Sequence, residues 1–272
     1  MTDRYAVAGN PLGHSKSPQI HMTFARTTGQ DIAYGKIEAP LDAFSECVER
    51  FRAAGGRGMN VTAPFKLEAF ALATRRMPRA EYAGATNCLR FENDEIIAEN
   101  FDGIGLVNDI QRNLGYVLAG KRVLMIGAGG AARGATIPLI EAGPASLTII
   151  NRTRAKAEAL QSAFSYAGPI RAGGLADVGN EDYDIVLNAT SASLRGEMPM
   201  IAGSVFRPTC LAYDLAYGKG LTPFLALARG QGAHLADGVG MLVEQAAEAF
   251  EWWRGVRPET ASVIESIRVP IC

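Results

Sequence analysis

The stretch RVLMIGAGGAARGATIPLIEAGPASLTIINRT, residues 122–153, decides the fold. It opens with the run RVLMI, passes through a glycine-rich turn at 127–130, continues as an alanine-rich helical pattern and closes with a second apolar run at 146–150. A strand, a tight turn, a helix and a second strand form a β-α-β unit, one half of a doubly wound nucleotide-binding fold. This region therefore predicts a Rossmann domain.

The glycine-rich turn also predicts a phosphate site. It fits the pattern G-x-G-x-x-A between a strand and a helix. The first glycine makes the tight turn, the second lets a pyrophosphate approach the backbone, and the start of the helix supplies free N–H groups. We therefore expect a dinucleotide to be bound by Gly127, Ala128, Gly129, Gly130 and Ala131.

The end of the second strand indicates which dinucleotide binds. NAD enzymes place an Asp or Glu here to accept a hydrogen bond from the ribose 2′-hydroxyl. This chain has Asn151, Arg152 and Thr153, followed by Lys156. A guanidinium binds a 2′-phosphate through two parallel hydrogen bonds. Cations near a helix N-terminus are unfavourable unless a bound anion compensates for their charge. These residues predict NADP rather than NAD.

The pattern on both sides extends the α/β class to the whole chain. Before this unit, apolar runs and helical periodicity predict strands at 4–8, 32–37 and 58–62, helices at 17–28, 41–54 and from 64, a hairpin at 87–98 and a helix at 102–114. After it, we expect a helix at 153–164, strands at 184–188, 210–215 and ending at 235, and helices at 240–253 and 259–269. Strands alternating with helices favour mostly parallel sheets.

The composition excludes several classes of protein. The chain has 272 residues, 48% of them hydrophobic, and a net charge of −1, so it offers no uncompensated basic surface for nucleic acid or an anionic membrane. No stretch reaches 18 consecutive apolar residues, and the N-terminus does not resemble an export signal. The four cysteines are far apart and lack metal-ligand spacing, so we expect reduced thiols, no metal and a cytoplasmic protein.

Two other predicted helix starts carry polar side chains suited to an anion or a hydroxyl. In HSKSP, residues 14–18, Ser17 is expected as the N-cap, with the proline directly after it. Ser15 has no such structural reason, so it is a candidate for holding a substrate carboxylate. In NVTAPFK, residues 60–66, Lys66 stands in the first helical turn, where a cation opposes the helix dipole. This position indicates that Lys66 has a function other than stabilising the helix.

A set of motifs resembles those of the shikimate dehydrogenase family. In chain order they are GNPLGHSKSP, NVTAPFK, AGATN, NFDG, GAGGAAR, NRT, NATS, KGLTPF and DGVGMLVEQ, and they run from residue 9 to residue 245. The resemblance implies reversible reduction of 3-dehydroshikimate to shikimate by NADPH, in the chorismate pathway of aromatic amino acid biosynthesis. It also implies an N-terminal substrate domain at 1–102, completed by helices at 240–272, a Rossmann NADP-binding domain at 103–239, and a cleft between them.

The resemblance also assigns roles to individual residues. It implies that Lys66 and Asp102 form the catalytic acid–base pair. It implies substrate binding by Ser15, Ser17, Asn60, Thr62, Asn87, Phe101, Tyr217 and Gln245, and cofactor binding by the glycine-rich turn, by Asn151, Arg152, Thr153 and Lys156, and by Thr190, Ser191, Gly238 and Met241. A small-molecule substrate and a monomer or homodimer are expected. For His14, His21 and His234 we expect structural or solvated roles.

Two positions depart from the family pattern. Phe101 stands where the family usually has a threonine that reaches a substrate hydroxyl, so a ring is expected in place of a small polar group. Ser193 stands where glycine is common, and the added bulk near the nicotinamide is either harmless or tilts its ring, which the sequence does not decide. Because of Phe101, a second alternative is a paralogue in the same family that acts on quinate, an amino analogue or another cyclic hydroxy acid. A third alternative is a catalytically quiet NADP-binding regulator, although retention of both Lys66 and Asp102 disfavours it.

Overall fold

The computed structural model describes residues 2–178 and 181–271. The chain forms two compact units. Unit 1 comprises Met1–Gly105 and Val243–Glu265, and unit 2 comprises Leu106–Leu242 and Ser266–Cys272. The boundaries fall within helices α5 (Asp102–Asn108), α9 (Val239–Arg254) and α10 (Ala261–Ile267). Each unit has its own sheet, so both are α/β, as the sequence predicts.

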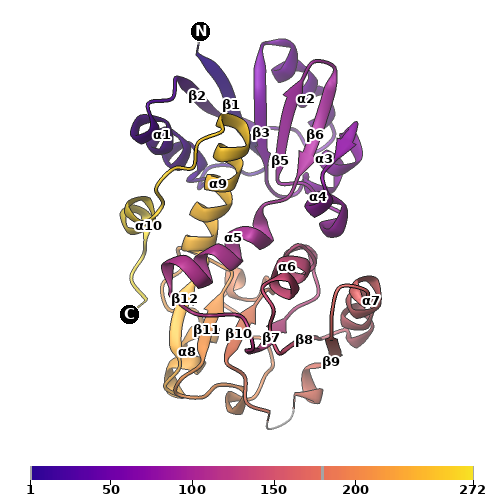
Figure 1. Cartoon of the computed structure of the whole chain (residues 1–272), viewed down its shortest axis with the longest axis vertical. Helices are drawn as coiled ribbons and strands as arrows, with labels where there is room; N and C mark the ends of the chain where they lie inside the picture. The colour runs from indigo at the N-terminus through magenta and orange to yellow at the C-terminus, as the bar shows by residue number, and fades with distance from the viewer. Residues whose placement is uncertain (1, 179–180, 272) are drawn as a thin grey trace. The chain divides into compact units, whose positions relative to one another are not determined.

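Unit 1 is built on a mixed sheet in the order β2-β1-β3-β5-β6-β4 (Figure 1). The strands are β1 (Asp3–Gly9), β2 (Ile32–Glu38), β3 (Gly56–Val61), β4 (Arg75–Arg76), β5 (Cys88–Glu92) and β6 (Glu95–Glu99). Only β5 runs against its neighbours, because it forms the predicted hairpin with β6. The helices are α1 (Ser17–Thr28), α2 (Phe44–Ala53), α3 (Lys66–Leu72), α4 (Pro78–Ala83), and most of α9 and α10 (Ala261–Ile267).

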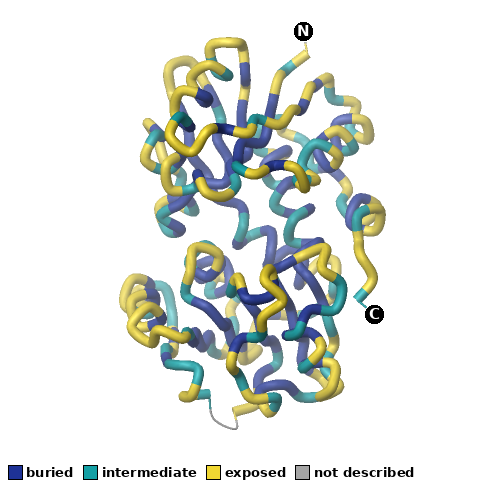
Figure 2. The backbone as a smooth tube through the Cα atoms, turned by 180° about the vertical axis from the view of Figure 1, so that it is seen from behind, coloured by how far each residue is buried: buried dark blue, intermediate teal, exposed yellow. Residues whose placement is uncertain are grey.

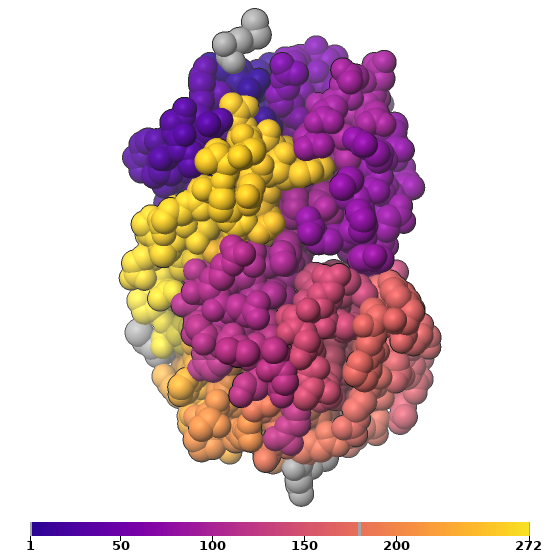
Figure 3. Space-filling view, in the orientation of Figure 1, coloured from indigo at the N-terminus to yellow at the C-terminus, as the bar shows by residue number. Residues whose placement is uncertain are grey.

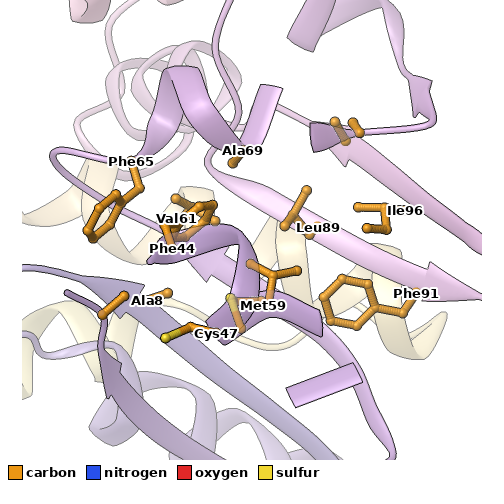
Figure 4. Close-up of a cluster of buried hydrophobic side chains, with 14 of the residues drawn as sticks. Ala8, Phe44, Cys47, Met59, Val61, Phe65, Ala69, Leu89, Phe91 and Ile96 are labelled. Atoms are coloured by element: carbon orange, nitrogen blue, oxygen red, sulfur yellow. The ribbon is translucent and has the colours of Figure 1, made fainter. Parts of the chain in front are cut away.

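One face of this sheet is covered by α2 and α3. Figure 4 shows the hydrophobic cluster here, which includes Met59 and Val61 of β3, Leu89 of β5, Phe44 of α2 and Phe65 directly before α3. Phe44 and Phe65 stack with 4.7 Å between ring centroids. Full burial of such side chains contributes roughly 1.5–3 kcal/mol each. This core fixes the end of β3 and the start of α3, the segments that carry Asn60, Thr62 and Lys66.

The part of α9 in unit 1 packs near the N-terminal strands. Trp253 stacks on Tyr5 with 4.6 Å between ring centroids, and its indole nitrogen donates to Leu89 O at 3.0 Å. Gly58 is required here, because a Cβ at this position would lie 2.5 Å from the indole nitrogen. Arg254 pairs with Asp3, so segments distant in sequence lie side by side, yellow against indigo in Figure 3.

Unit 2 has a wholly parallel sheet in the order β12-β11-β10-β7-β8-β9. This is the Rossmann order, in which strands are added on one side of β7 as far as β9 and then on its other side from β10 onward. The strands are β7 (Arg122–Ile126), β8 (Ser146–Asn151), β9 (Ile170–Gly174), β10 (Ile185–Asn188), β11 (Leu211–Asp214) and β12 (His234–Asp237), and the helices are α6 (Gly130–Glu141), α7 (Arg154–Phe164) and α8 (Pro223–Gly230). Figure 2 shows buried backbone in the strands and exposed backbone mainly in helices and loops.

Several boundaries differ from the predicted ones. The predicted helix at 41–54 begins only at Phe44, because a turn in which Ala43 donates to Pro40 O precedes it. The helix expected at 102–114 passes into a π-helical turn at Asp109–Asn113. The sequence analysis did not predict α4, α8, β4 or β9. The last of these contains two glycines, which have low strand propensity, and it forms by pairing with β8.

Two observations bear on the expected class of protein. Among the described residues, no helix is long and apolar enough to cross a membrane. Cys47, Cys88 and Cys210 are buried and unpaired, as expected of structural thiols, and Cys272 lies outside the described residues.

Candidate functional site

A lysine and an aspartate meet in unit 1. Lys66 is the first residue of α3 and Asp102 the first residue of α5, and Lys66 Nζ donates to Asp102 Oδ2 at 2.5 Å. The lysine side chain is 33% exposed and the aspartate 17%. The pair therefore combines a tight charge-assisted hydrogen bond with access from outside the fold.

Two asparagines hold Asp102 in place, one through its carboxylate and the other through its backbone N–H. Asn87 Nδ2 donates to Asp102 Oδ1 at 2.8 Å, while Asn87 Oδ1 accepts from the Phe101 N–H at 2.9 Å. Asn100 Oδ1 accepts from the Asp102 N–H at 3.0 Å, and its amide nitrogen is bound to Ala85 O. Asn100 was not predicted as a site residue. Its signal is local, because an asparagine two residues before a helix start can accept from the backbone there.

Further predicted residues gather around Asn87. Asn87 Nδ2 also donates to Gln245 Oε1 of α9 at 3.2 Å. Gly105 allows α5 and α9 to approach so closely, because a Cβ on it would lie 2.8 Å from the Gln245 nitrogen. Asn60 is buried on β3, and its Nδ2 faces Asn87 O at 3.4 Å. Thr62 follows that strand and is partly exposed.

The serines at the start of α1 differ from the expected arrangement. Ser17 is the first residue of the helix, and the preceding Lys16 has no capping side-chain bond, so the predicted N-cap at Ser17 is wrong. Ser15 Oγ instead accepts from the Ser17 N–H at 3.4 Å. Ser15 thus has a local structural role at the helix start, which the sequence analysis did not predict. Both side chains are partly exposed, which leaves them accessible to an anion.

The ring of Phe101 does not occupy the position expected of it. It is 1% exposed and packs with Cys88 and Ala249, in an edge-on contact with Trp252. Only its backbone N–H takes part in the asparagine network described above. The expectation of a bulky ring exposed to substrate is therefore wrong, because a hydrophobic cluster beneath α9 accommodates the side chain.

In unit 2, the glycine-rich turn has the geometry of a phosphate cradle. Gly127 has φ +114°, and a Cβ on it would lie 3.1 Å from the Ala189 carbonyl, so a side chain is disfavoured on both counts. A Cβ on Gly129 or Gly130 would meet nothing within 4 Å, so open space lies before the start of α6. This helix has no acidic residue in its first turn. An anion fits this helix start, together with Ala128 and Ala131.

The loop after β8 is suited to a 2′-phosphate. Arg152, Thr153 and Lys156 are exposed, and Asn151 Nδ2 donates to Thr153 O at 2.9 Å. Arg154 is engaged by Glu158 at 2.8 Å and Asp177 at 3.0 Å. Arg152 has no such ion pair in the part of the chain that the structure describes. The pKa of Glu197 is lowered mainly by its bond from Arg195, with a smaller contribution from Arg152. These residues fit NADP.

The segment after β10 explains Ser193. Its Oγ donates to the buried carboxylate of Asp214 at 2.5 Å and accepts from Asn188 Nδ2 at 3.0 Å. Thr190 Oγ1 donates to Asn188 Oδ1 at 2.7 Å, so the same network anchors the loop that carries Thr190 and the exposed Ser191. Ser193 is 3% exposed. Its side chain therefore points into the protein, where it bonds to both Asp214 and Asn188.

The remaining predicted residues of unit 2 lie near the ends of β11 and β12. Gly238 has no room for a side chain, because a Cβ would lie 2.2 Å from Leu215 O. The Met241 N–H donates to the buried Tyr213 hydroxyl at 3.3 Å. Tyr217 is 40% exposed. Among residues 2–178 and 181–271, no group of three His, Cys, Asp or Glu side chains is placed to hold a metal ion.

Comparison with known proteins identifies the family. Residues 7–89 match a model described as the shikimate dehydrogenase substrate binding domain, residues 109–202 match shikimate/quinate 5-dehydrogenase, and residues 238–268 match the shikimate 5′-dehydrogenase C-terminal domain. Shikimate dehydrogenase (NADP(+)) of Nitrosospira multiformis is 55% identical over 269 residues, which are 98% of each chain.

Solved structures agree with this assignment. The crystal structure of an Ael1 enzyme from Pseudomonas putida is similar with a TM-score of 0.97 and 55% identity over 100% of both chains. Shikimate 5-dehydrogenase from Thermus thermophilus, in complex with NADP(H) and shikimate, matches with a TM-score of 0.88 and 30% identity over 98% of both chains. The 5-ketofructose reductase of a Gluconobacter strain matches with a TM-score of 0.88 and 25% identity over 98% of both chains. The chain belongs to the shikimate dehydrogenase family.

Proposed function

We propose that this protein is an NADP-dependent oxidoreductase that interconverts 3-dehydroshikimate and shikimate. The observation that carries the proposal is the bond of 2.5 Å between Lys66 Nζ and Asp102 Oδ2. An ammonium held beside a carboxylate can donate a proton to a ketone oxygen as it becomes an alcohol. The family membership and the NADP-suited loop after β8 support the cofactor and the substrate class.

In this proposal Lys66 and Asp102 divide the acid–base chemistry between them. When bound, NADPH supplies a hydride to the carbonyl carbon. Lys66 Nζ donates a hydrogen bond to the carbonyl oxygen, stabilises the negative charge that develops there and transfers one proton to it. Asp102 keeps the amine aligned, and the partial exposure of Lys66 allows a proton to be replaced from solvent. In the reverse direction, neutral Lys66 accepts the hydroxyl proton.

The substrate-binding and cofactor-binding roles are part of the same proposal. The predicted substrate residues Ser15, Ser17, Asn60, Thr62, Asn87 and Gln245 belong to unit 1, with Tyr217 in unit 2. The predicted cofactor residues belong to unit 2. We assign unit 1 to substrate and unit 2 to NADP, with boundaries close to the predicted 1–102, 103–239 and 240–272. We further propose a cytoplasmic monomer or homodimer that has no nucleic-acid partner, which the net charge of −1 supports.

A second candidate is a paralogue that acts on another cyclic hydroxy acid, such as quinate or an amino analogue. The similarity to a 5-ketofructose reductase favours some substrate diversity within this fold. Phe101 no longer supports this alternative, because its ring is buried. Among the residues predicted to bind substrate, no other departure from the family pattern disfavours shikimate.

The experiment is a comparison of turnover with different substrates and cofactors. Reduction of NADP is followed with shikimate, with quinate, with an amino analogue and with no substrate, and the series is repeated with NAD. We expect the highest kcat/KM with shikimate and NADP. A higher value with quinate or the amino analogue would support the paralogue. Binding of NADP without turnover of any of these substrates would support a regulatory protein and contradict the proposal.

A further inference from the structure

Tyr34 is hydrogen-bonded to one of the predicted substrate residues. It lies on β2, and its hydroxyl donates to Asn60 Oδ1 of β3 at 2.6 Å, inside the protein. Burial raises the pKa of Tyr34 well above its usual value, and Ser17 of α1 opposes this rise. The phenol thus bonds to an asparagine proposed to bind a ring hydroxyl of the substrate.

The strand register explains why a tyrosine is needed. β2 and β3 are not neighbours, because β1 lies between them. Tyr34 is paired with Tyr5 of β1, and Asn60 with Val7, two residues further along and therefore on the same face of the sheet. Only a long side chain crosses the intervening strand. Phenylalanine has nearly the same reach but cannot donate to Asn60.

The ring of Tyr34 is held rigidly by His21. The two rings lie face to face, with 4.3 Å between centroids and 7° between planes. His21 is 0% exposed and neither ring nitrogen has a hydrogen-bond partner within normal distance. Burial lowers its pKa to about 3, so the ring is neutral, and the Asn60 amide opposes this effect only weakly. His21 therefore serves as a packing surface for Tyr34 and not as an acid.

The bond from Tyr34 decides which way the Asn60 amide points. Because Oδ1 accepts from the phenol, Nδ2 is turned away from it and toward Asn87 O at 3.4 Å. A flipped amide would place its oxygen against the Asn87 carbonyl oxygen, and two acceptors would then face each other. Asn60 is thus fixed as a donor on its remaining side.

We propose that Tyr34 is a positioning residue, which fixes the Asn60 amide so that its N–H donates to a hydroxyl oxygen of the bound substrate. The inference rests on the proposed function, since it deepens the account of the same site. Through Tyr34, strand β2 then contributes to substrate selection. Tyr34 itself touches neither the reacting atoms nor the cofactor in this account. Its removal should weaken substrate binding and leave the chemical step intact.

The test is a double-mutant cycle with Tyr34→Phe and Asn60→Ala. For Tyr34→Phe we expect KM for shikimate to rise about 5- to 15-fold, the effect of one lost hydrogen bond. The values of kcat and of KM for NADP should stay within about twofold of wild type. In the Asn60→Ala background, Tyr34→Phe should raise KM no further, because Tyr34 acts through that amide. Tyr82→Phe is the control, since the Tyr82 hydroxyl has no hydrogen bond in the described structure.

Two outcomes would overturn the inference. One is an unchanged KM for shikimate in Tyr34→Phe, and the other is an equal rise in KM with and without Asn60. A fall in kcat together with a higher KM for NADP would indicate general structural damage and would also contradict it. Wild-type turnover of shikimate tests the proposed function separately. If wild type prefers another cyclic acid, the same cycle is measured with that acid and judged by the same criteria.

Discussion

Asn87 and Asp102 are joined by a hydrogen bond of 2.8 Å from Nδ2 to Oδ1, while Lys66 holds the other carboxylate oxygen. Both oxygens of Asp102 are therefore engaged before any substrate binds. Such a preformed arrangement limits the reorganisation that proton transfer requires. It also separates the roles of the two residues, because Asn87 orients the carboxylate and Lys66 carries the transferable proton.

Replacing Lys66 by alanine should lower kcat roughly 100-fold or more, because the proton donor for the ketone oxygen is lost. The KM for shikimate should change little, since the side chain acts mainly in the transition state. Steady-state kinetics in both directions measure both values. Lys121→Ala, at an exposed position, is the control and should behave as wild type. A near-normal kcat in Lys66→Ala would remove this residue from the mechanism.

Arg152 and Arg154 provide a matched pair for the cofactor. Arg152→Ala should raise KM for NADP about 10- to 100-fold, because a charged hydrogen bond to the 2′-phosphate is lost, and it should leave KM for NAD nearly unchanged. Arg154→Ala should have little effect on either, since its guanidinium is bound to Glu158 and Asp177. Equal effects of the two substitutions would argue against a phosphate-specific role for Arg152.

Replacing Phe101 by threonine should cost about 3 kcal/mol or more of unfolding free energy, because it empties space beneath α9 and buries a hydroxyl there. It should bring no gain in kcat/KM with shikimate. Urea unfolding and steady-state kinetics check the two parts. Tyr166→Ala, at a side chain 69% exposed, is the control and should stay within about 0.5 kcal/mol of wild type. Improved turnover of shikimate would show that the ring does reach the substrate.

Ser193→Ala should destabilise the protein by about 1–3 kcal/mol, since it removes a donor from the buried Asp214 carboxylate. The exposed Ser204→Ala serves as its control and should be nearly neutral. Urea unfolding measures both. Because the Ser193 side chain is turned into the protein, kcat should remain close to that of wild type. A large change in kcat at unchanged stability would place Ser193 beside the cofactor after all.

His21 should make the protein sensitive to acid. Its pKa is lowered by burial to about 3 in the folded state, against about 6.5 in the unfolded chain, which therefore binds a proton more readily. The stabilisation is present in full above pH 6.5 and is lost as the pH falls toward 3, by about 5 kcal/mol over the whole range. His21→Phe should flatten the dependence of unfolding free energy on pH in this range.

The exposed His14 offers the comparison for this measurement. His14→Gln should keep the wild-type slope between pH 6.5 and pH 4. An unchanged slope in His21→Phe would contradict the assignment of the acid sensitivity to His21.

The sequence by itself determined the parts of this protein that depend on local pattern. The strand, glycine turn and helix at residues 122–141 are found where they were predicted. The reason is that an apolar run, a glycine with positive φ and a helix start are each specified by residues adjacent in the sequence. The hairpin at 88–99 follows from its turn residues in the same way. The choice of candidate site residues came largely from a resemblance, since no pattern could pair Lys66 with Asp102 across 36 positions.

Only the tertiary structure decided where ambiguous side chains go. Phe101 and Ser193 looked like changes in the site, yet both are turned into the protein, one into an apolar cluster and the other onto a buried carboxylate. Tyr34 gave no sequence signal, because its partner Asn60 lies across an intervening strand and the contact depends on register. Local sequence specifies backbone preference, but side-chain partners distant in the chain are set by packing that the whole fold must supply.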